Sequence, residues 1–343
     1  MPGPGHAATL RPMDEPIHQP HDKLFKASFS DPANAAAFLK SRVSPELAAG
    51  IEWESLRLEP GSFIDSRFRH SESDLLFSAP FGQTGQPKTS RCHFHFLLEH
   101  LSSPVPLIAL RLLCYKTRIW EECLARAKAS GEPCRGLPVV MAVVVAQNDG
   151  RWEISPRFAD LFDIPEGFEE IVRPFIPDFS FSLLQLGEIP YDAIAGTPAG
   201  ILTLRVLKAD RSGELLGDEV WDEALMMEVA RECFERVLRY LMRGGIDTQA
   251  FEARVEKIIE PQLRSTTMTL AEQYIEKGIV KGREEGREES RKADILEALE
   301  IRFGTVPEGV RDAVESAGGQ QRLRELHRAA ITSATLEEFA GAL

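Results

Sequence analysis

Residues 74–99 read DLLFSAPFGQTGQPKTSRCHFHFLLE, and they contain two short apolar, aromatic-rich runs separated by a turn-forming cluster. Runs of this length, bounded by Gly and Pro, are typical of β-strands. The sequence therefore predicts a β-hairpin in which strands 74–81 and 92–99 pair about the loop. If they pair symmetrically, opposed residues have numbers with a constant sum, so Asp74 faces Glu99 as Phe81 faces Cys92.

The chain around this hairpin predicts a mixed α/β core. Before it, the pattern indicates helices over 21–29 and 33–41, the second introduced by Asp31-Pro32, and a strand over 51–58. After it, helical spacing from Val105 continues to Gly131, and the Val-rich run 137–146 predicts a buried strand. Strand, helix and strand in this order favour a parallel crossover, and hence one mixed sheet flanked by helices.

The rest of the chain predicts mainly helix. Residues 147–215 are rich in Pro and Gly and show no clear pattern, whereas 218–243 and 246–260 look helical, and a long polar helix is expected over 269–303 after Pro261. We therefore divide the chain into four segments: an N-terminal arm 1–20, an α/β domain 21–165, a mixed then helical region 166–265, and a helical tail 266–343.

Composition narrows the class of protein. The five cysteines are odd in number and lack zinc-ligand spacing, so we expect a cytoplasmic protein. The longest apolar run is too short for a membrane helix, so we expect no membrane span. No GxxxxGK[ST] motif is present, so no nucleotide cofactor is expected. The net charge of -13 does not exclude nucleic acid, because residues 21–120 carry 12 basic and 10 acidic side chains and the acidity lies elsewhere.

The opposed carboxylates of Asp74 and Glu99 allow two interpretations. Like charges directly across a strand pair repel, so a cation between them would explain the arrangement, and Mg²⁺ or Mn²⁺ prefers such oxygen ligands. Alternatively, the two residues only end their strands in solvent, where acidic side chains are common. Local pattern alone leaves both interpretations open.

Several motifs together carry a family resemblance over residues 21–165. They are HDKLFKASFSDP from position 21, FIDSRFRHSESDLLF from 63, FHFLLEHLSS from 94, ALRLLCYKTRIW from 109 and LPVVMAVVV from 137. Their order and spacing resemble the Rpn family of recombination-promoting nucleases, whose members are also described as transposases. The tail motifs KGxxxGRxEGR and LEIRFGTVPEGV resemble a C-terminal extension of the same family.

The resemblance implies a PD-(D/E)XK restriction-endonuclease-like core and a metal-dependent endonuclease that hydrolyses DNA in recombination or transposition. It implies that Asp74 is the motif aspartate and Glu99 the motif glutamate, and that both hold Mg²⁺ or Mn²⁺, with Asp22 as an accessory acidic metal ligand.

The sequence departs from the family at Leu101, where the superfamily has Lys and this family usually Gln, because leucine has no polar group to orient a water. Arg111 and Lys116, on the helix that follows, are the candidates to replace that group; Arg111 matches the family pattern, whereas for Lys116 the interpretation as a solvated helix lysine is favoured. His100 is a further candidate, because its ring nitrogen would lie beside the metal if the helix ran on from Glu99, although adjacent strand residues point to opposite faces. The alternative is a weakened protein that acts as a DNA-binding or oligomerising module.

The tail has a separate pattern of small residues. Gly278, Gly282 and Gly286, with Ser290 in phase, recur every four residues and place a bare stripe along one helix face. Each interior Gly costs about 1 kcal/mol of helix propensity relative to Ala. We therefore expect a homo-oligomer through this helix, with a flexible charged linker as the alternative.

Overall fold

The computed structural model describes residues 20–60, 75–82, 92–101, 103–131, 136–148, 150–243 and 246–343; of 92–99, 277–281 and 285 it describes the backbone. The chain divides into two compact units, the first ending at Met268 and the second beginning at Thr269. Each unit is taken by itself below. Among the described residues, no helix has the length and apolar character needed to cross a membrane.

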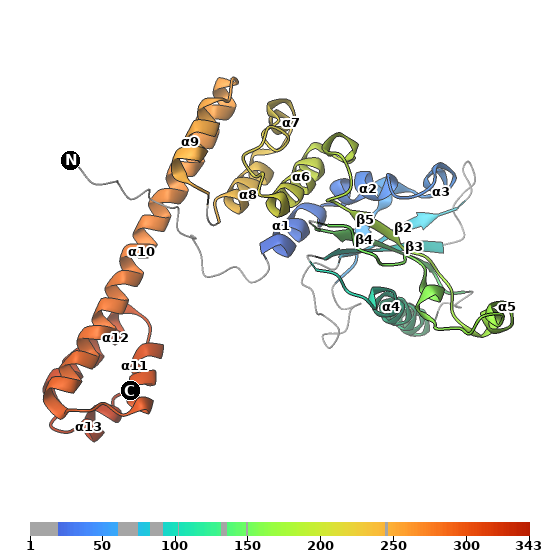
Figure 1. The fold of residues 1–343 in the computed structure, drawn as a ribbon. Coiled ribbons are helices and arrows are strands. Elements are labelled where there is room, and N and C mark those ends of the chain that lie inside the picture. The colour runs from blue at the N-terminus through green and yellow to red at the C-terminus, as the bar shows by residue number, and fades with distance from the viewer. Residues whose placement is uncertain are drawn as a thin grey trace. The chain divides into compact units, whose positions relative to one another are not determined.

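The first unit contains a five-stranded mixed sheet among its described residues (Figure 1). Its strands follow one another in chain order: β1 (Arg57–Leu58), β2 (Leu75–Phe81), β3 (Cys92–Leu101), β4 (Val139–Ala146) and β5 (Ser182–Gln185). The pairs β1–β2 and β2–β3 are antiparallel, and the pairs β3–β4 and β4–β5 are parallel. The predicted mixed sheet and its parallel crossover are confirmed.

The register of the hairpin agrees with the sequence prediction over every described pair. Seven pairs run from Leu75 opposite Leu98 to Phe81 opposite Cys92, so the paired numbers sum to 173 throughout. The side-chain period of two fixes such a register wherever one face is buried, because a slip of one residue would turn the apolar side chains outward. Asp74, at the start of the predicted strand, lies outside the described residues.

Helices cover both faces of the sheet (Figure 1). On one face, α4 (Ile108–Ser130) packs its apolar side chains against Ala142, Val144 and Ala146 of β4. On the other face lie α1 (Pro20–Phe29), α2 (Pro32–Lys40) and α6 (Pro198–Ser212), and α1 contacts β3. Gly131 ends α4 in the left-handed conformation, with φ at 69°, as its place in the sequence predicts.

The start of the domain partly follows the prediction. Asp31 caps α2 through Oδ1, which accepts from the Ala33 amide, and Pro32 occupies the first turn. The predicted strand 51–58 is confirmed only at its ends, as a bridge of Ile51 to Phe81 and as the two residues of β1. Before and between them the chain forms α3 (Pro45–Gly50) and the 3-10 helix η1 (Trp53–Ser55). The Trp53 indole donates back to the Ala48 carbonyl at 3.0 Å, which favours a turn over an extended strand.

The segment that the sequence left unassigned contains short elements before α6. They are the 3-10 helix η3 (Phe158–Leu161), α5 (Glu169–Val172), the 3-10 helix η4 (Arg173–Phe175), β5 and the 3-10 helix η5 (Tyr191–Ala193).

Residues 218–243, which the sequence predicts to be helical, form two helices, α7 (Glu223–Met227) and α8 (Arg231–Leu241), with a break between them. Asp222 starts α7 by accepting from the Leu225 amide, so the preceding residues are not helical. The next helix, α9, spans Thr248–Glu256 and is capped by Asp247.

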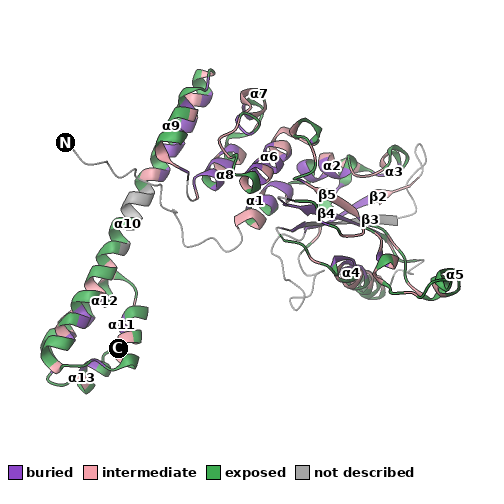
Figure 2. Ribbon diagram, in the orientation of Figure 1, coloured by how far each residue is buried: buried purple, intermediate pink, exposed green. Residues whose placement is uncertain are grey.

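The second unit is helical. The helix α10 (Pro261–Phe303) belongs to this unit from Thr269 on; it ends at the predicted residue but begins earlier than predicted, with Pro261 in its first turn. Its last turns pack with α11 (Glu308–Ser316), α12 (Gln320–Thr332) and α13 (Leu336–Ala340) around a core of nine buried residues, including Leu299 and Phe339, both fully buried. Figure 2 shows this core as buried stretches on otherwise exposed helices.

Candidate active site at the ends of strands β3 and β4

The start of β2 and the end of β3 lie at the same edge of the sheet, because the two strands are antiparallel. Glu99 pairs through its backbone with Val144 near the end of β4, and Leu101 pairs with Ala146. The Glu99 side chain and all of Asp74 lie outside what the structure describes. The neighbouring residues at this end of the sheet are nevertheless described.

Asp22 lies at this edge, held by the residue that follows Glu99. Its Oδ1 is 2.7 Å from Nδ1 of His100, and the His100 side chain is completely buried. The His100 ring stacks on Phe25, with ring centroids 5.1 Å apart, so it lies on the α1 face of the sheet. Sequence reasoning gave His100 no firm role, because its partner lies 78 residues away in the chain.

His21, directly before Asp22, belongs to a second polar cluster. Its Nδ1 lies 2.6 Å from the Tyr240 hydroxyl and 3.4 Å from Oδ2 of Asp210, whose other oxygen accepts from Arg243 at 2.7 Å. Burial first, and then the Arg243 charge, lower the pKa of His21 to about 4, so His21 is neutral at pH 7. Burial also raises the pKa of Tyr240, which therefore keeps its proton.

Gln147 joins this cluster to the end of the sheet. Its backbone amide donates to the Leu101 carbonyl at 2.7 Å, and its side-chain Nε2 donates to the Leu207 carbonyl of α6 at 2.8 Å. Nε2 also lies 3.3 Å from Nδ1 of His21. The sequence offered no signal for Gln147, Asp210, Tyr240 or Arg243, because the contacts that gather them span between 33 and 219 residues.

Leu101 and Arg111 belong to the opposite face of the sheet. Leu101 is 7% exposed and packs in an apolar cluster with Ile108 and Ala109 of α4. Arg111 is half-buried on the same helix, and its guanidinium carbon lies 5.8 Å from the centre of the Tyr115 ring. The structure therefore brings Asp22 and Arg111 to elements on different faces of the sheet.

The interpretation of Lys116 as a solvated lysine is wrong. Lys116 is 7% exposed, donates to the Val140 carbonyl at 2.6 Å, and has its amine 4.3 Å from the centre of the Phe179 ring. Burial lowers its pKa to about 8. Val140 pairs with His95, which precedes Glu99 by four residues. Four residues of a strand span roughly 13 Å, so Lys116 lies away from the proposed site.

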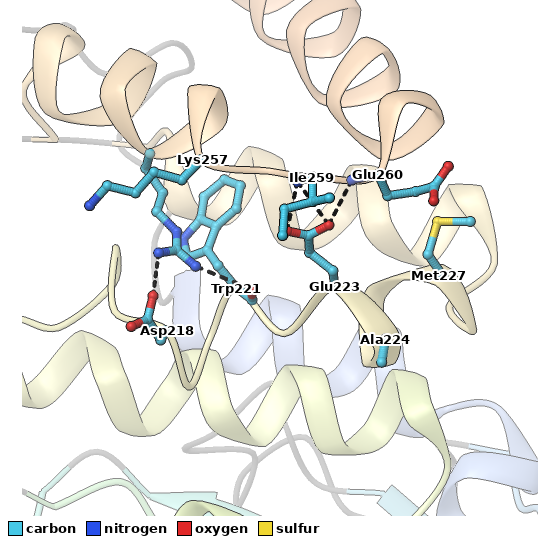
Figure 3. A pocket seen from close by; sticks show the side chains of 9 residues that line it. Asp218, Trp221, Glu223, Ala224, Met227, Lys257, Ile259 and Glu260 are labelled. Atoms are coloured by element: carbon cyan, nitrogen blue, oxygen red, sulfur yellow. Dashed lines mark hydrogen bonds and ion pairs between the residues drawn. The ribbon is translucent and has the colours of Figure 1, made fainter.

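The described residues contain no cluster of three or more side chains able to hold a metal ion. A hollow of about 630 Å³ lies instead among residues of α7, α9 and the segments that flank them (Figure 3). There the Glu223 carboxylate accepts from the backbone amides of Ile259 and Glu260, and Arg254 forms an ion pair with Asp218. The Glu223 contacts join α7 to the residues just before α10, and the ion pair joins α9 to the segment before α7, so all of them serve to hold the helices together.

The fold and the site together define a mixed α/β protein with a polar cluster at the carboxyl ends of two parallel strands. Residues 19–232 match the family described as "Putative transposase, YhgA-like", and the chain belongs to that family. No solved structure shows a significant match.

Curated relatives give the same picture of the family. The chain is 24% identical to recombination-promoting nuclease RpnD of Escherichia coli O157:H7 over 74% of its length and 93% of the relative. It is 26% identical to the inactive recombination-promoting nuclease-like protein RpnE of Escherichia coli K12, over 76% of this chain and 82% of the relative. It is 24% identical to recombination-promoting nuclease RpnA of the same strain, over 76% and 84%. The predicted resemblance to the Rpn nucleases is confirmed.

Proposed function

We propose that the protein is a metal-dependent DNA endonuclease with a PD-(D/E)XK core, which hydrolyses phosphodiester bonds in recombination or transposition. The relatives RpnD and RpnA are named recombination-promoting nucleases, which supports the class of activity. The mixed sheet flanked by helices supports the proposed core. A DNA substrate and the odd number of cysteines agree with a cytoplasmic location, which belongs to the same proposal.

The observation that carries the proposal is the register of β2 and β3. The paired numbers sum to 173 over all seven described pairs, and one further pair in the same register would be Asp74 with Glu99. Asp22 is proposed as an accessory oxygen donor that reaches this end of the sheet from the α1 face, since its partner His100 alternates along β3 with Glu99. Its hydrogen bond to His100 fits this role, because metal-binding carboxylates are commonly held by such outer contacts. An Mg²⁺ or Mn²⁺ ion, when bound, would activate a water and neutralise charge on the phosphate.

Arg111 is proposed to supply the positive group that Leu101 does not. It lies one turn into α4, whose first residues pack with Leu101 at the end of β3. A guanidinium keeps its charge at all working pH values and binds phosphate oxygens through several donors. Lys116 is not proposed for this role, because it donates to a carbonyl in the part of β4 that pairs with His95.

Plasmid cleavage tests the proposal. The purified protein is incubated with supercoiled DNA and Mg²⁺ or Mn²⁺, with EDTA as the metal-free control. We expect metal-dependent nicking that falls to the EDTA level in Asp74→Asn and in Glu99→Gln, and that is retained in Asp192→Asn, an exposed acid on η5. If Asp74→Asn or Glu99→Gln cuts as fast as the parent, the proposed site is wrong.

A second candidate function is DNA binding without efficient cleavage. It is favoured by the leucine at position 101, which is packed in an apolar cluster, and by RpnE, a relative named as inactive. Gel-shift titration of duplex DNA beside the cleavage assay separates the two. Binding with no product in Mn²⁺ would select the second function.

We also propose self-association through α10. Gly282 and Gly286 are exposed, and a Cβ built at either position meets no atom within 4 Å, so that face of the helix offers close approach. Two associated copies would bring two cleavage sites to one duplex.

A further inference from the structure

A second hollow, of about 640 Å³, opens at the carboxyl ends of the parallel strands β3 and β4. Its walls are residues 151–155, which follow β4, and Pro104 and Pro106, which follow β3; Ala109 of α4 and Leu161 of η3 also line it. The volume lies within the roughly 300 to 1,000 Å³ of ordinary ligand sites. In sheets of this kind, ligands bind outside the carboxyl ends of the strands. The hollow therefore has the size and the place of a binding site.

The hollow adjoins the proposed catalytic edge. Ala109 and Trp152 belong to the same apolar cluster as Leu101, the last residue of β3, and Leu161 packs against that cluster. Alternate residues of a strand point to the same face, so we expect the proposed metal ligand Glu99 on the face of Leu101 and of the hollow. A ligand in the hollow would then lie beside the phosphate that is cleaved.

The walls of the hollow are fixed by polar contacts. Gln185 of β5 holds the backbone of Trp152, because its Oε1 accepts from the Trp152 amide at 2.6 Å and its Nε2 donates to the Trp152 carbonyl at 3.3 Å. The Ser155 hydroxyl donates to the carboxylate of Asp160 in η3, which joins the far end of this wall to the 3-10 helix. The hollow thus has a defined shape of its own.

The side chains around the hollow combine apolar walls with three charged groups. Arg151 is exposed, and within the part of the chain that the structure describes it forms no hydrogen bond or ion pair. Glu153 and Asp160 are also exposed and add two carboxylates. A matching ligand has an apolar surface, an N–H donor for the carboxylates and an anionic group for the guanidinium.

One unstacked nucleotide has all three features. The face of its base is apolar, the amino group of a base such as cytosine donates to Asp or Glu, and its phosphate suits an arginine. A base that is stacked and paired inside a duplex cannot enter a hollow of this kind, whereas an unpaired base can do so at little cost.

We propose that this hollow binds one unpaired, amino-bearing base of the DNA next to the cleaved phosphate, and that Arg151 binds the phosphate of the same nucleotide. The inference rests on the proposed function, because it takes DNA as the substrate. It identifies the preferred substrate as DNA with a bulged or mismatched base, since the free energy of unstacking is smallest there.

Fluorescence anisotropy in EDTA, and again in Ca²⁺, measures binding by the full-length protein. The labelled duplexes are fully paired or carry one bulged cytosine, one bulged thymine or one bulged abasic site. The cytosine bulge should bind at least tenfold more tightly than the abasic bulge and at least threefold more tightly than the thymine bulge. Equal affinity for the cytosine and abasic bulges would overturn the inference, because the bend at a bulge would then explain any preference.

Variants locate the effect in the hollow. Leu161→Trp fills it and should reduce the tenfold preference to below twofold, while the fully paired duplex binds as before. Arg151→Gln should weaken binding of every duplex and lower the salt dependence by about one phosphate contact. Lys128→Gln, at an exposed position near the opposite end of α4, is the matched control and should change neither.

A second variant guards against misfolding, because Leu161 is partly buried. Glu153 is exposed, so Glu153→Ala should keep the melting temperature and reduce the preference for cytosine over thymine to below twofold. If both variants keep the parent's preferences, the base binds elsewhere and the inference is wrong. A parent that cuts plasmid DNA but has no preference overturns this inference alone, whereas a parent that binds no DNA in either buffer overturns the proposed function with it.

Discussion

Lys116 shows at the residue scale how burial changes the chemistry of a side chain. Its pKa is lowered from 10.5 to about 8, because the charged amine loses solvent among α4, β4 and Phe179. Between these two pH values the unfolded chain binds a proton that the folded chain does not. The free energy of unfolding therefore rises with pH across this window, and the penalty is fully present below about pH 8.

The test compares wild type with Lys116→Met, which keeps the length of the side chain. From pH 7.5 to 10.5 the free energy of unfolding of wild type should rise relative to the variant by on the order of 2 to 3 kcal/mol. Urea unfolding at each pH measures both proteins, and taking the difference removes the tyrosines that titrate in the same range. If the free energies of unfolding of the two proteins change with pH in parallel, folding does not lower the pKa of Lys116.

Leu101 couples stability and the proposed activity. It packs in the apolar cluster against α4, so Leu101→Gln buries an amide there and should lower the free energy of unfolding by about 2 to 4 kcal/mol. We expect cleavage by the folded protein to rise, because an amide can orient a water. Leu101→Met is the matched control and should cost less than about 1.5 kcal/mol. No gain in cleavage would indicate that another group, such as Arg111, already fills the role.

At the scale of elements, α10 holds exposed glycines in a continuous helix of 43 residues. Gly282→Ala with Gly286→Ala should stabilise the helix by about 1 kcal/mol per site and preserve association through this face. The double change to leucine should block close approach of a second helix and shift the assembly toward smaller species. The two pairs of substitutions thus separate helix propensity from contact.

Circular dichroism and light scattering coupled to size exclusion measure the two effects. If the leucine variant keeps the parent's mass, the glycine face is not a contact surface, and the interpretation of this segment as a linker would stand.

At the scale of the whole molecule, each of the two units has its own core. Phe339 is completely buried in the helical unit, whereas Phe251 is 3% exposed in the first unit. Phe339→Ala should destabilise the second unit by about 3 to 5 kcal/mol, because it leaves a cavity in a small core. The first unit should keep its stability, since its core does not include Phe339.

Hydrogen exchange followed by mass spectrometry resolves this by peptide. We expect Phe339→Ala to lose protection over residues 295–340 and to keep it over β3 and β4. Phe251→Ala should lose protection in the helices around α9 and keep it over residues 295–340. Loss of protection across both units in either variant would mean that they unfold as one.

The sequence alone determined the features that depend on near neighbours. Two apolar runs paired symmetrically about one loop were enough for the register of β2 and β3, and Asp31-Pro32 and Gly131 were enough for two helix ends, because caps and turns act over a few residues. Several motifs in order were enough for the family. Asp74 and Glu99 remain predictions of the metal site that rest on this level.

Only the tertiary structure decided which distant residues meet. Asp22 with His100, and His21 with Tyr240, are pairs 78 and 219 residues apart, so no local period could indicate them. The same holds for two single residues. Lys116 is buried although the sequence indicated an exposed helix position, and Phe175 is exposed although aromatic residues are usually buried. The physical reason is that burial depends on what the rest of the chain packs against a residue, and local periodicity carries no record of that.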